Sequence, residues 1–158
     1  MQRRRRGVTF ATLARLGAVL IAGATVLVLL DASSASPQAT PASYPTCGTY
    51  WNRNTPVTPA QRRVNSCIVR AAREGRRARA VAVLTTIEGD PIPTYVYVRA
   101  KGDLLVVTDS MRDRFGSGGW ERSRCRMLGV EGGILAFGGC RTLGAGKPPW
   151  LRPIRLPS

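Results

Sequence analysis

The pattern of apolar and polar positions predicts one helix between residues 58 and 75. Apolar residues recur there at helical spacing and form one stripe: Val64, Cys67, Ile68, Ala71 and Ala72. Thr58 is suited to cap the start of this helix, with Pro59 in its first turn and Gln61 as the reciprocal capping partner. Gly75 is the expected end, because glycine adopts the left-handed conformation of a C-terminal cap at little cost.

After the helix the pattern changes to alternation and short apolar runs, which are typical of strands. We predict five strands: Arg79 to Glu88, Pro93 to Ala100, Leu104 to Ser110, Glu121 to Val130 and Ile134 to Arg141. Every connection except the Gly-rich one is short, so consecutive strands should pair antiparallel. The predicted fold is α+β, with one N-terminal helix packed on an antiparallel meander sheet of about five strands.

Aromatic side chains are predicted to gather on one side of the sheet. Tyr95 and Tyr97 share a face of the second strand, and Trp120 precedes the fourth. Such residues more often form core beneath a helix, and they otherwise offer a platform for a sugar or another protein.

The N-terminus has the pattern of an export signal. Residues 3–6 are arginines, and residues 16–30 are uncharged and apolar. As a helix that run would be roughly 22 Å long, shorter than the ~30 Å hydrocarbon core. Small residues at Ser33 and Ala35 favour a signal peptide over residues 1–35. The alternative is an uncleaved membrane anchor whose apolar run extends back to Val8.

The rest of the chain divides by composition into three parts. Residues 36–46 are rich in Pro, Ser, Thr and Ala and are predicted to form a flexible spacer. Residues 47–146 are predicted to form the single α+β domain. Residues 147–158 are Pro-rich and basic, so we expect an extended tail or a segment that covers a sheet edge.

Four cysteines follow the signal segment, and their even number predicts two disulfides in an oxidising compartment: Cys47, Cys67, Cys125 and Cys140. Cys125 and Cys140 are symmetric about Gly132-Gly133, a two-residue hairpin turn, so we expect them to pair across two strands. This pairing leaves Cys47 for Cys67. The chain has no histidine and no C-x-x-C pair, so no metal site and no cofactor are predicted.

A net charge of +15, or +11 without residues 1–35, favours an anionic partner. Arginines are expected on the polar side of the helix and form the candidate binding surface: Arg62, Arg63, Arg70, Arg73 and Arg77. The partner would be a wall polymer, lipid head groups or another envelope protein, whereas nucleic acid is not expected outside the cell. The alternative is that the arginines only solvate the surface.

Carboxylates gather in the predicted turns and strand ends: Glu88, Asp90, Asp109 and Asp113. Two of them could act as acid and base on a glycan. Asp109 and Asp113 are better suited to cap the turn before Phe115, or to pair with Arg112 and Arg114. Because histidine is absent, a serine nucleophile with a histidine base is excluded.

Several of these residues form a spaced motif that is similar to one in a known family. The motif consists of Thr85-Thr86-Ile87-Glu88-Gly89-Asp90-Pro91-Ile92, then Tyr95, Asp109, Asp113, Phe115-Gly116, Trp120 and Cys125. With Cys67 on the preceding helix, the pattern resembles a family of small exported proteins of Gram-positive bacteria and actinobacteria, many of them lipid-anchored. The resemblance covers about residues 60 to 140 and implies no assigned activity. This chain lacks the lipid-attachment cysteine of the anchored members.

The sequence therefore predicts a non-enzymatic module of the cell envelope or the secreted fraction that binds an anionic or protein partner. It would be extracytoplasmic, either secreted or held by an uncleaved N-terminal helix, which would be its only membrane contact. The alternative is an envelope glycan hydrolase that uses Glu88, Asp90 or Asp109.

Overall fold

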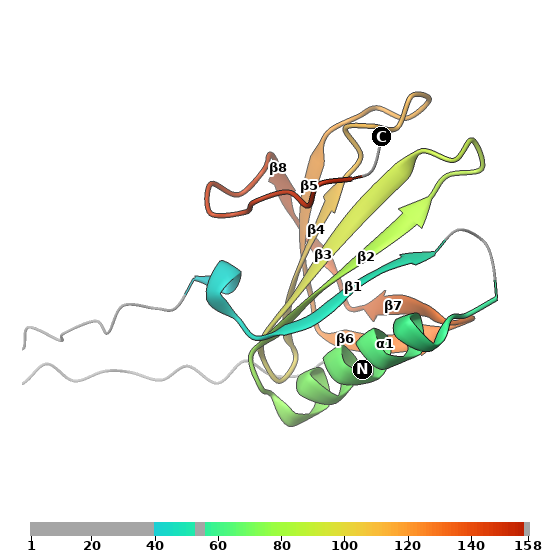
Figure 1. The fold of residues 1–158 in the computed structure, drawn as a ribbon. Coiled ribbons are helices and arrows are strands. Elements are labelled where there is room, and N and C mark those ends of the chain that lie inside the picture. The colour runs from blue at the N-terminus through green and yellow to red at the C-terminus, as the bar shows by residue number, and fades with distance from the viewer. Residues whose placement is uncertain (1–39, 53–55, 157–158) are drawn as a thin grey trace, which may run out of the picture. The chain divides into compact units, whose positions relative to one another are not determined.

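A six-stranded sheet of order β1-β2-β3-β4-β5-β8 organises the chain in the computed structural model, which describes residues 40–52 and 56–156 (Figure 1). Its strands are β1 (Thr46–Asn52), β2 (Ala78–Thr85), β3 (Pro91–Ala100), β4 (Asp103–Asp109), β5 (Trp120–Cys125) and β8 (Arg141–Ala145). Strands β6 (Met127–Glu131) and β7 (Ile134–Gly138) form a separate two-stranded sheet. The helices are η1 (Pro41–Ser43), a short 3₁₀ turn, and α1 (Pro59–Glu74). The predicted signal segment, residues 1–35, lies outside the described residues.

Helix α1 has the predicted ends. The Thr58 hydroxyl accepts a hydrogen bond from the backbone N–H of Gln61, and Gly75 adopts the left-handed conformation at φ 68°. The Gln61 side chain does not return a bond to the cap as predicted. Its amide nitrogen donates instead to the Gly133 carbonyl at 2.7 Å, as does that of Asn65. These two bonds attach the helix to the turn between β6 and β7.

The expectation that the helix is the first element is wrong, because β1 precedes it. β1 pairs in parallel with β2, and α1 is the connection between them. Thr46, the last residue of the predicted spacer, is the first residue of this strand, and Tyr44 before it is buried. The short strand contains an irregularity at Gly48, where φ is 113°, which interrupts its alternating pattern.

The predicted count of five strands is also wrong, because two predicted strands are each divided. The chain leaves the large sheet after Cys125, forms the β6–β7 hairpin, and returns as β8 to pair with β5. The breaks fall at Arg126 and at Gly139, whose φ is 62°. Strands β2 to β5 do form the predicted antiparallel meander.

The sheet buries apolar side chains on both faces. On one face, α1 and the β6–β7 hairpin share a core with the sheet that includes Ile68, Val98 and Leu135 (Figure 1). On the other face, Tyr95 and Tyr97 form a second core with Leu151. The tyrosines therefore do not lie beneath the helix. Residues 147–156, which we call the C-terminal segment, cover them; the segment crosses this face of the sheet and does not extend an edge (Figure 1).

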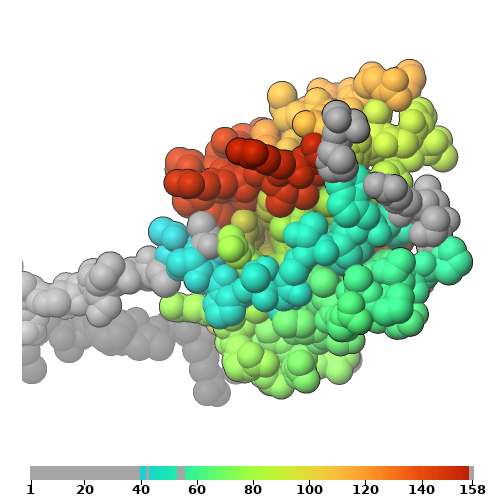
Figure 2. Space-filling model, in the orientation of Figure 1, coloured from blue at the N-terminus to red at the C-terminus, as the bar shows by residue number. Residues whose placement is uncertain are grey.

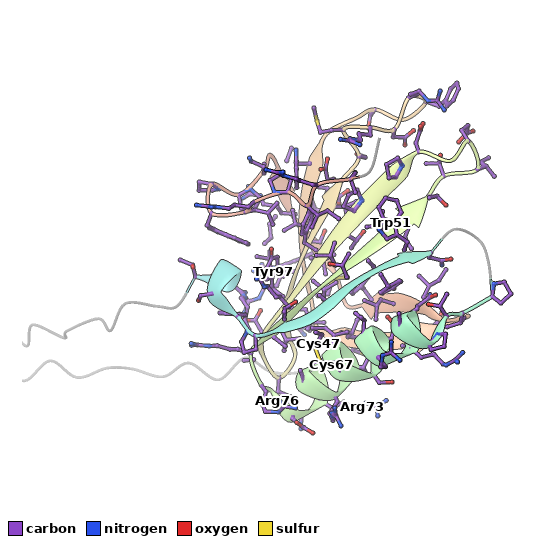
Figure 3. The ribbon with its side chains drawn as sticks, viewed as in Figure 1. Cys47, Trp51, Cys67, Arg73, Arg76 and Tyr97 are labelled. Carbon is purple, nitrogen blue, oxygen red and sulfur yellow. A yellow bond between two sulfur atoms is a disulfide. The ribbon has the colours of Figure 1, made fainter. Side chains whose placement is uncertain are left out.

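Both predicted disulfides are present. Cys47–Cys67 joins β1 to α1 (Figure 3), and Cys125–Cys140 joins the two points where the chain leaves and re-enters the large sheet. The second pair therefore closes the base of the hairpin. Within residues 40–52 and 56–156, no helix has the length and apolar character needed to cross a membrane.

The two glycines of the hairpin turn give a stability test of the contact between the hairpin and Val57, which leads into the helix. Both have positive φ, so alanine at either position should cost about 1–2 kcal/mol. A Cβ at Gly133 would also collide with Val57, whereas one at Gly132 would meet nothing. Gly133→Ala should therefore lower the free energy of unfolding by about 1–3 kcal/mol more than Gly132→Ala, measured by urea denaturation. Equal losses would contradict the described contact.

Candidate functional site

Basic side chains gather where the end of α1, the β3–β4 turn and the β5–β8 edge meet. A depression of about 550 Å³ is lined by Gly102, Arg124, Arg126, Gly139 and Arg141. A second one, of about 220 Å³, is lined by residues that include Arg73, Lys101, Gly102 and Arg126. The two share Gly102 and Arg126, so they are neighbours. We call their five cations the basic surface: Arg73, Lys101, Arg124, Arg126 and Arg141.

Local structure explains how these cations meet. Arg124 of β5 is directly opposite Arg141 of β8 in the sheet register. At the other end, a Cβ at Gly75 would lie 3.1 Å from the backbone nitrogen of Lys101, so the end of the helix packs closely on the β3–β4 turn. That contact brings Arg73 toward Lys101, because Arg73 lies in the last turn of α1. Figure 3 shows Arg73 at this end of the helix.

Asp103 is the acidic residue closest to this group, and arginines already neutralise it. Its Oδ1 accepts hydrogen bonds from Arg99 Nη2 at 2.7 Å and from Arg124 Nε at 2.8 Å. Burial by itself would raise the pKa of Asp103, but the hydrogen bonds and charges of the two arginines together lower it. Arg126 and Arg141 form no ion pair with the acidic residues of the described ranges.

The predicted helix arginines are all exposed, but they do not form one group. Arg73 lines the basic surface. Arg62 donates to the Val57 carbonyl at 2.8 Å, and Arg77 lies over the Tyr44 ring at 5.6 Å. Eleven residues of helix separate Arg62 from Arg73, or about 16 Å along the axis. The remaining two, Arg63 and Arg70, are in solvent on the same helix.

Four members of the basic surface were not predicted from the sequence: Lys101, Arg124, Arg126 and Arg141. Lys101 joins the group through its contact with the end of the helix. The grouping of the three arginines depends on the pairing of β5 with β8 and on the break at Arg126. Neither feature has a local sequence signal, because both are consequences of the hairpin leaving the sheet.

The predicted carboxylate cluster lies in the two loops at the opposite end of the meander. Asp90 is 8% exposed, and its two oxygens accept hydrogen bonds from the backbone N–H and the Nε of Arg114. These bonds join the β2–β3 turn to the β4–β5 loop. Arg114 therefore pairs with Asp90, and not with Asp109 or Asp113 as we considered from the sequence.

Asp109 and Asp113 cap turns within their own loop. Asp109 Oδ1 accepts from the N–H of Met111, and Asp113 Oδ1 accepts from those of Phe115 and Gly116. A side chain at position 116 would collide with the Asp113 carboxylate, which explains the glycine there. Among the residues that the structure describes, no three His, Cys, Asp or Glu side chains are placed to hold a metal ion. The hydrogen bonds of Asp90, Asp109 and Asp113 therefore stabilise the β2–β3 turn and the β4–β5 loop.

Comparison with known proteins does not assign a family to the chain. No family model, no curated protein and no solved structure matches it. The resemblance to small exported proteins of Gram-positive bacteria and actinobacteria stays a prediction.

The stabilising contribution of Asp103 should depend on pH. Its folded-state pKa is lowered, so the contribution is fully present above the ordinary carboxyl pKa and is lost as the pH falls through the folded value. Asp103→Asn should therefore be less stable than the wild type at pH 7. The difference should begin to shrink as the pH falls below about 4, and it should be lost once the pH is below the folded value. Urea unfolding between pH 7 and pH 2 measures this, with the exposed Glu131→Gln as the control. A difference that does not change with pH would contradict the ion pairs.

Proposed function

We propose that this protein is a non-enzymatic binding module for an anionic polymer of the cell envelope and that the basic surface is its binding site. The observation that carries the proposal is the gathering of five cations around two adjoining depressions with no acidic residue in their lining. Surface cations repel each other, and a polyanion removes that repulsion while it releases counterions.

The geometry of the basic surface suits a chain of anionic groups better than a single ion. Neighbouring strands are about 5 Å apart, so Arg124 and Arg141 can each contact a different charged group along a polymer. Arg73 and Lys101 extend the charge from the sheet to the end of the helix. Guanidinium groups bind phosphate and carboxylate through paired hydrogen bonds, so either kind of polymer fits.

The two disulfides support a location outside the cytoplasm, because such bonds persist in oxidising compartments. In this proposal the protein is secreted or is held by an uncleaved N-terminal segment. Envelope polymers with phosphate or carboxylate groups would then be its accessible partners.

The alternative, a glycan hydrolase, gains no support from the carboxylates. An acid and base pair must be free to exchange protons with substrate. Asp90, Asp109 and Asp113 instead accept hydrogen bonds within the loops that they stabilise.

Charge reversal in the basic surface tests the proposal. The double variant Arg126→Glu/Arg141→Glu should bind long-chain polyphosphate at least about tenfold more weakly than the wild type, because two attractive contacts become repulsive. Its affinity should also fall less steeply with NaCl, since fewer counterions are released. The measurement is a binding isotherm at several salt concentrations.

The matched control is Arg62→Glu/Arg63→Glu, which changes the net charge equally in the first turn of α1, away from the basic surface. This variant should retain most of the affinity. Equal losses in the two double variants would mean that total charge, and not the basic surface, determines binding.

A further inference from the structure

A second concave site lies on the face of the sheet that the helix does not cover. It is a cleft of about 400 Å³ between β1 and the C-terminal segment, with β2 and β3 as its floor. Figure 2 shows a hollow between these two segments, in which the sheet is visible. Ligand sites of small molecules commonly have volumes of roughly 300–1,000 Å³, so this cleft is large enough for one ring and its substituents.

Arg79 is the side chain in the cleft that most requires a partner. It is partly buried, its Nε is out of contact with solvent, and that atom makes no hydrogen bond in the described structure. No ion pair of Arg79 occurs there either, and no acidic residue lines the cleft. A guanidinium nitrogen that is hidden from water and lacks a hydrogen bond is unfavourable, so an anion in the cleft that accepts from this Nε would stabilise Arg79. Arg152 lines the cleft from the C-terminal segment and adds a second cation.

Tyr97, directly opposite Arg79 in the sheet register, does not supply the missing negative charge. Burial raises the pKa of Tyr97 to about 12, although the charge of Arg79 acts in the opposite direction. The phenol is therefore neutral at physiological pH. Its hydroxyl remains a hydrogen-bond donor.

Aromatic rings form much of the remaining lining. Tyr97 and Trp150 meet edge to face with their ring centroids 5.1 Å apart, and both line the cleft. Tyr95 also lines it, and its hydroxyl accepts a hydrogen bond from the backbone N–H of Ile154 at 3.0 Å. That bond attaches the C-terminal segment to the sheet and holds the cleft open beside it. In Figure 3 Tyr97 lies on the side of β1 away from the helix. Tyr97 is only 4% exposed and supports Trp150 from the core, whereas the partly exposed Trp150 presents apolar surface to a ligand ring.

We propose that the cleft binds a small organic anion that consists of one ring with a carboxylate or phosphate group. The anionic group would contact Arg79 and Arg152, and the ring would pack against Trp150. This site does not depend on the proposed polymer binding, because it shares no residue with the basic surface.

The test uses the full-length protein with both disulfides formed, labelled with ¹⁵N. Glucuronate and benzoate are the probes, with glucose and benzyl alcohol as their neutral counterparts, so a sugar ring and an aromatic ring are distinguished. The readout is the indole N–H signal of Trp150, assigned from its loss in Trp150→Phe. At least one of the acids should shift this signal saturably, and its neutral counterpart should not.

Arg79→Gln should weaken binding of that acid at least about tenfold, because it removes a charge-assisted contact. Arg152→Gln, at an exposed position, gives the same test with little risk to folding. The control is Arg155→Gln, which removes an equal charge outside the cleft and should change the affinity less than about twofold. Polyphosphate binding should be unaffected in Arg79→Gln, so failure here and failure of the proposed function are distinguishable.

Three results would overturn the proposal: no shift of Trp150 with either acid, equal shifts with the neutral compounds, or an equal loss of affinity in Arg155→Gln and Arg79→Gln.

Discussion

An apolar sheet has two faces to cover, and the described part of the chain has one long helix with which to do so. Helix α1 and the β6–β7 hairpin cover one face, and the C-terminal segment covers part of the other. This constraint explains the departure of the chain from the sheet at Cys125, since the hairpin completes the core around the helix. It also explains the cleft, because a segment of about ten residues without a helix leaves part of the second face open.

The disulfides maintain this arrangement at its two weakest points. Cys47–Cys67 holds β1, the edge strand, to the helix that follows it, and Cys125–Cys140 closes the base of the hairpin. The described ion pairs engage only four arginines, through Glu74, Asp90 and Asp103. Arg124 of the basic surface is one of these four. The other cations of the basic surface and those of the cleft form no described ion pair and remain for ligands: Arg73, Lys101, Arg126, Arg141, Arg79 and Arg152.

Sequence reasoning predicted the elements that have local signals. The caps at Thr58 and Gly75, the hairpin turn at Gly132-Gly133 and the cysteine spacing each depend on a few neighbouring residues. Strand β1 was missed because it is interrupted at Gly48 and pairs in parallel with a distant strand. The basic surface was missed, apart from Arg73, because it depends on the pairing of Arg124 with Arg141 and on the contact between Gly75 and Lys101. Such contacts are made between segments far apart in the sequence, so no local pattern predicts them.

The central claim is that arginines without acidic partners are held for anionic ligands, and thermal stability tests it most directly. A ligand that binds only the folded state stabilises it by RT ln(1 + [L]/Kd), so the melting temperature continues to rise with ligand concentration. We expect millimolar tripolyphosphate, at constant ionic strength, to raise the melting temperature of the wild type. The rise should increase with concentration and should be much smaller when Arg126 and Arg141 are both replaced by Gln. A wild type that does not respond, or a double variant that responds equally, would contradict the account.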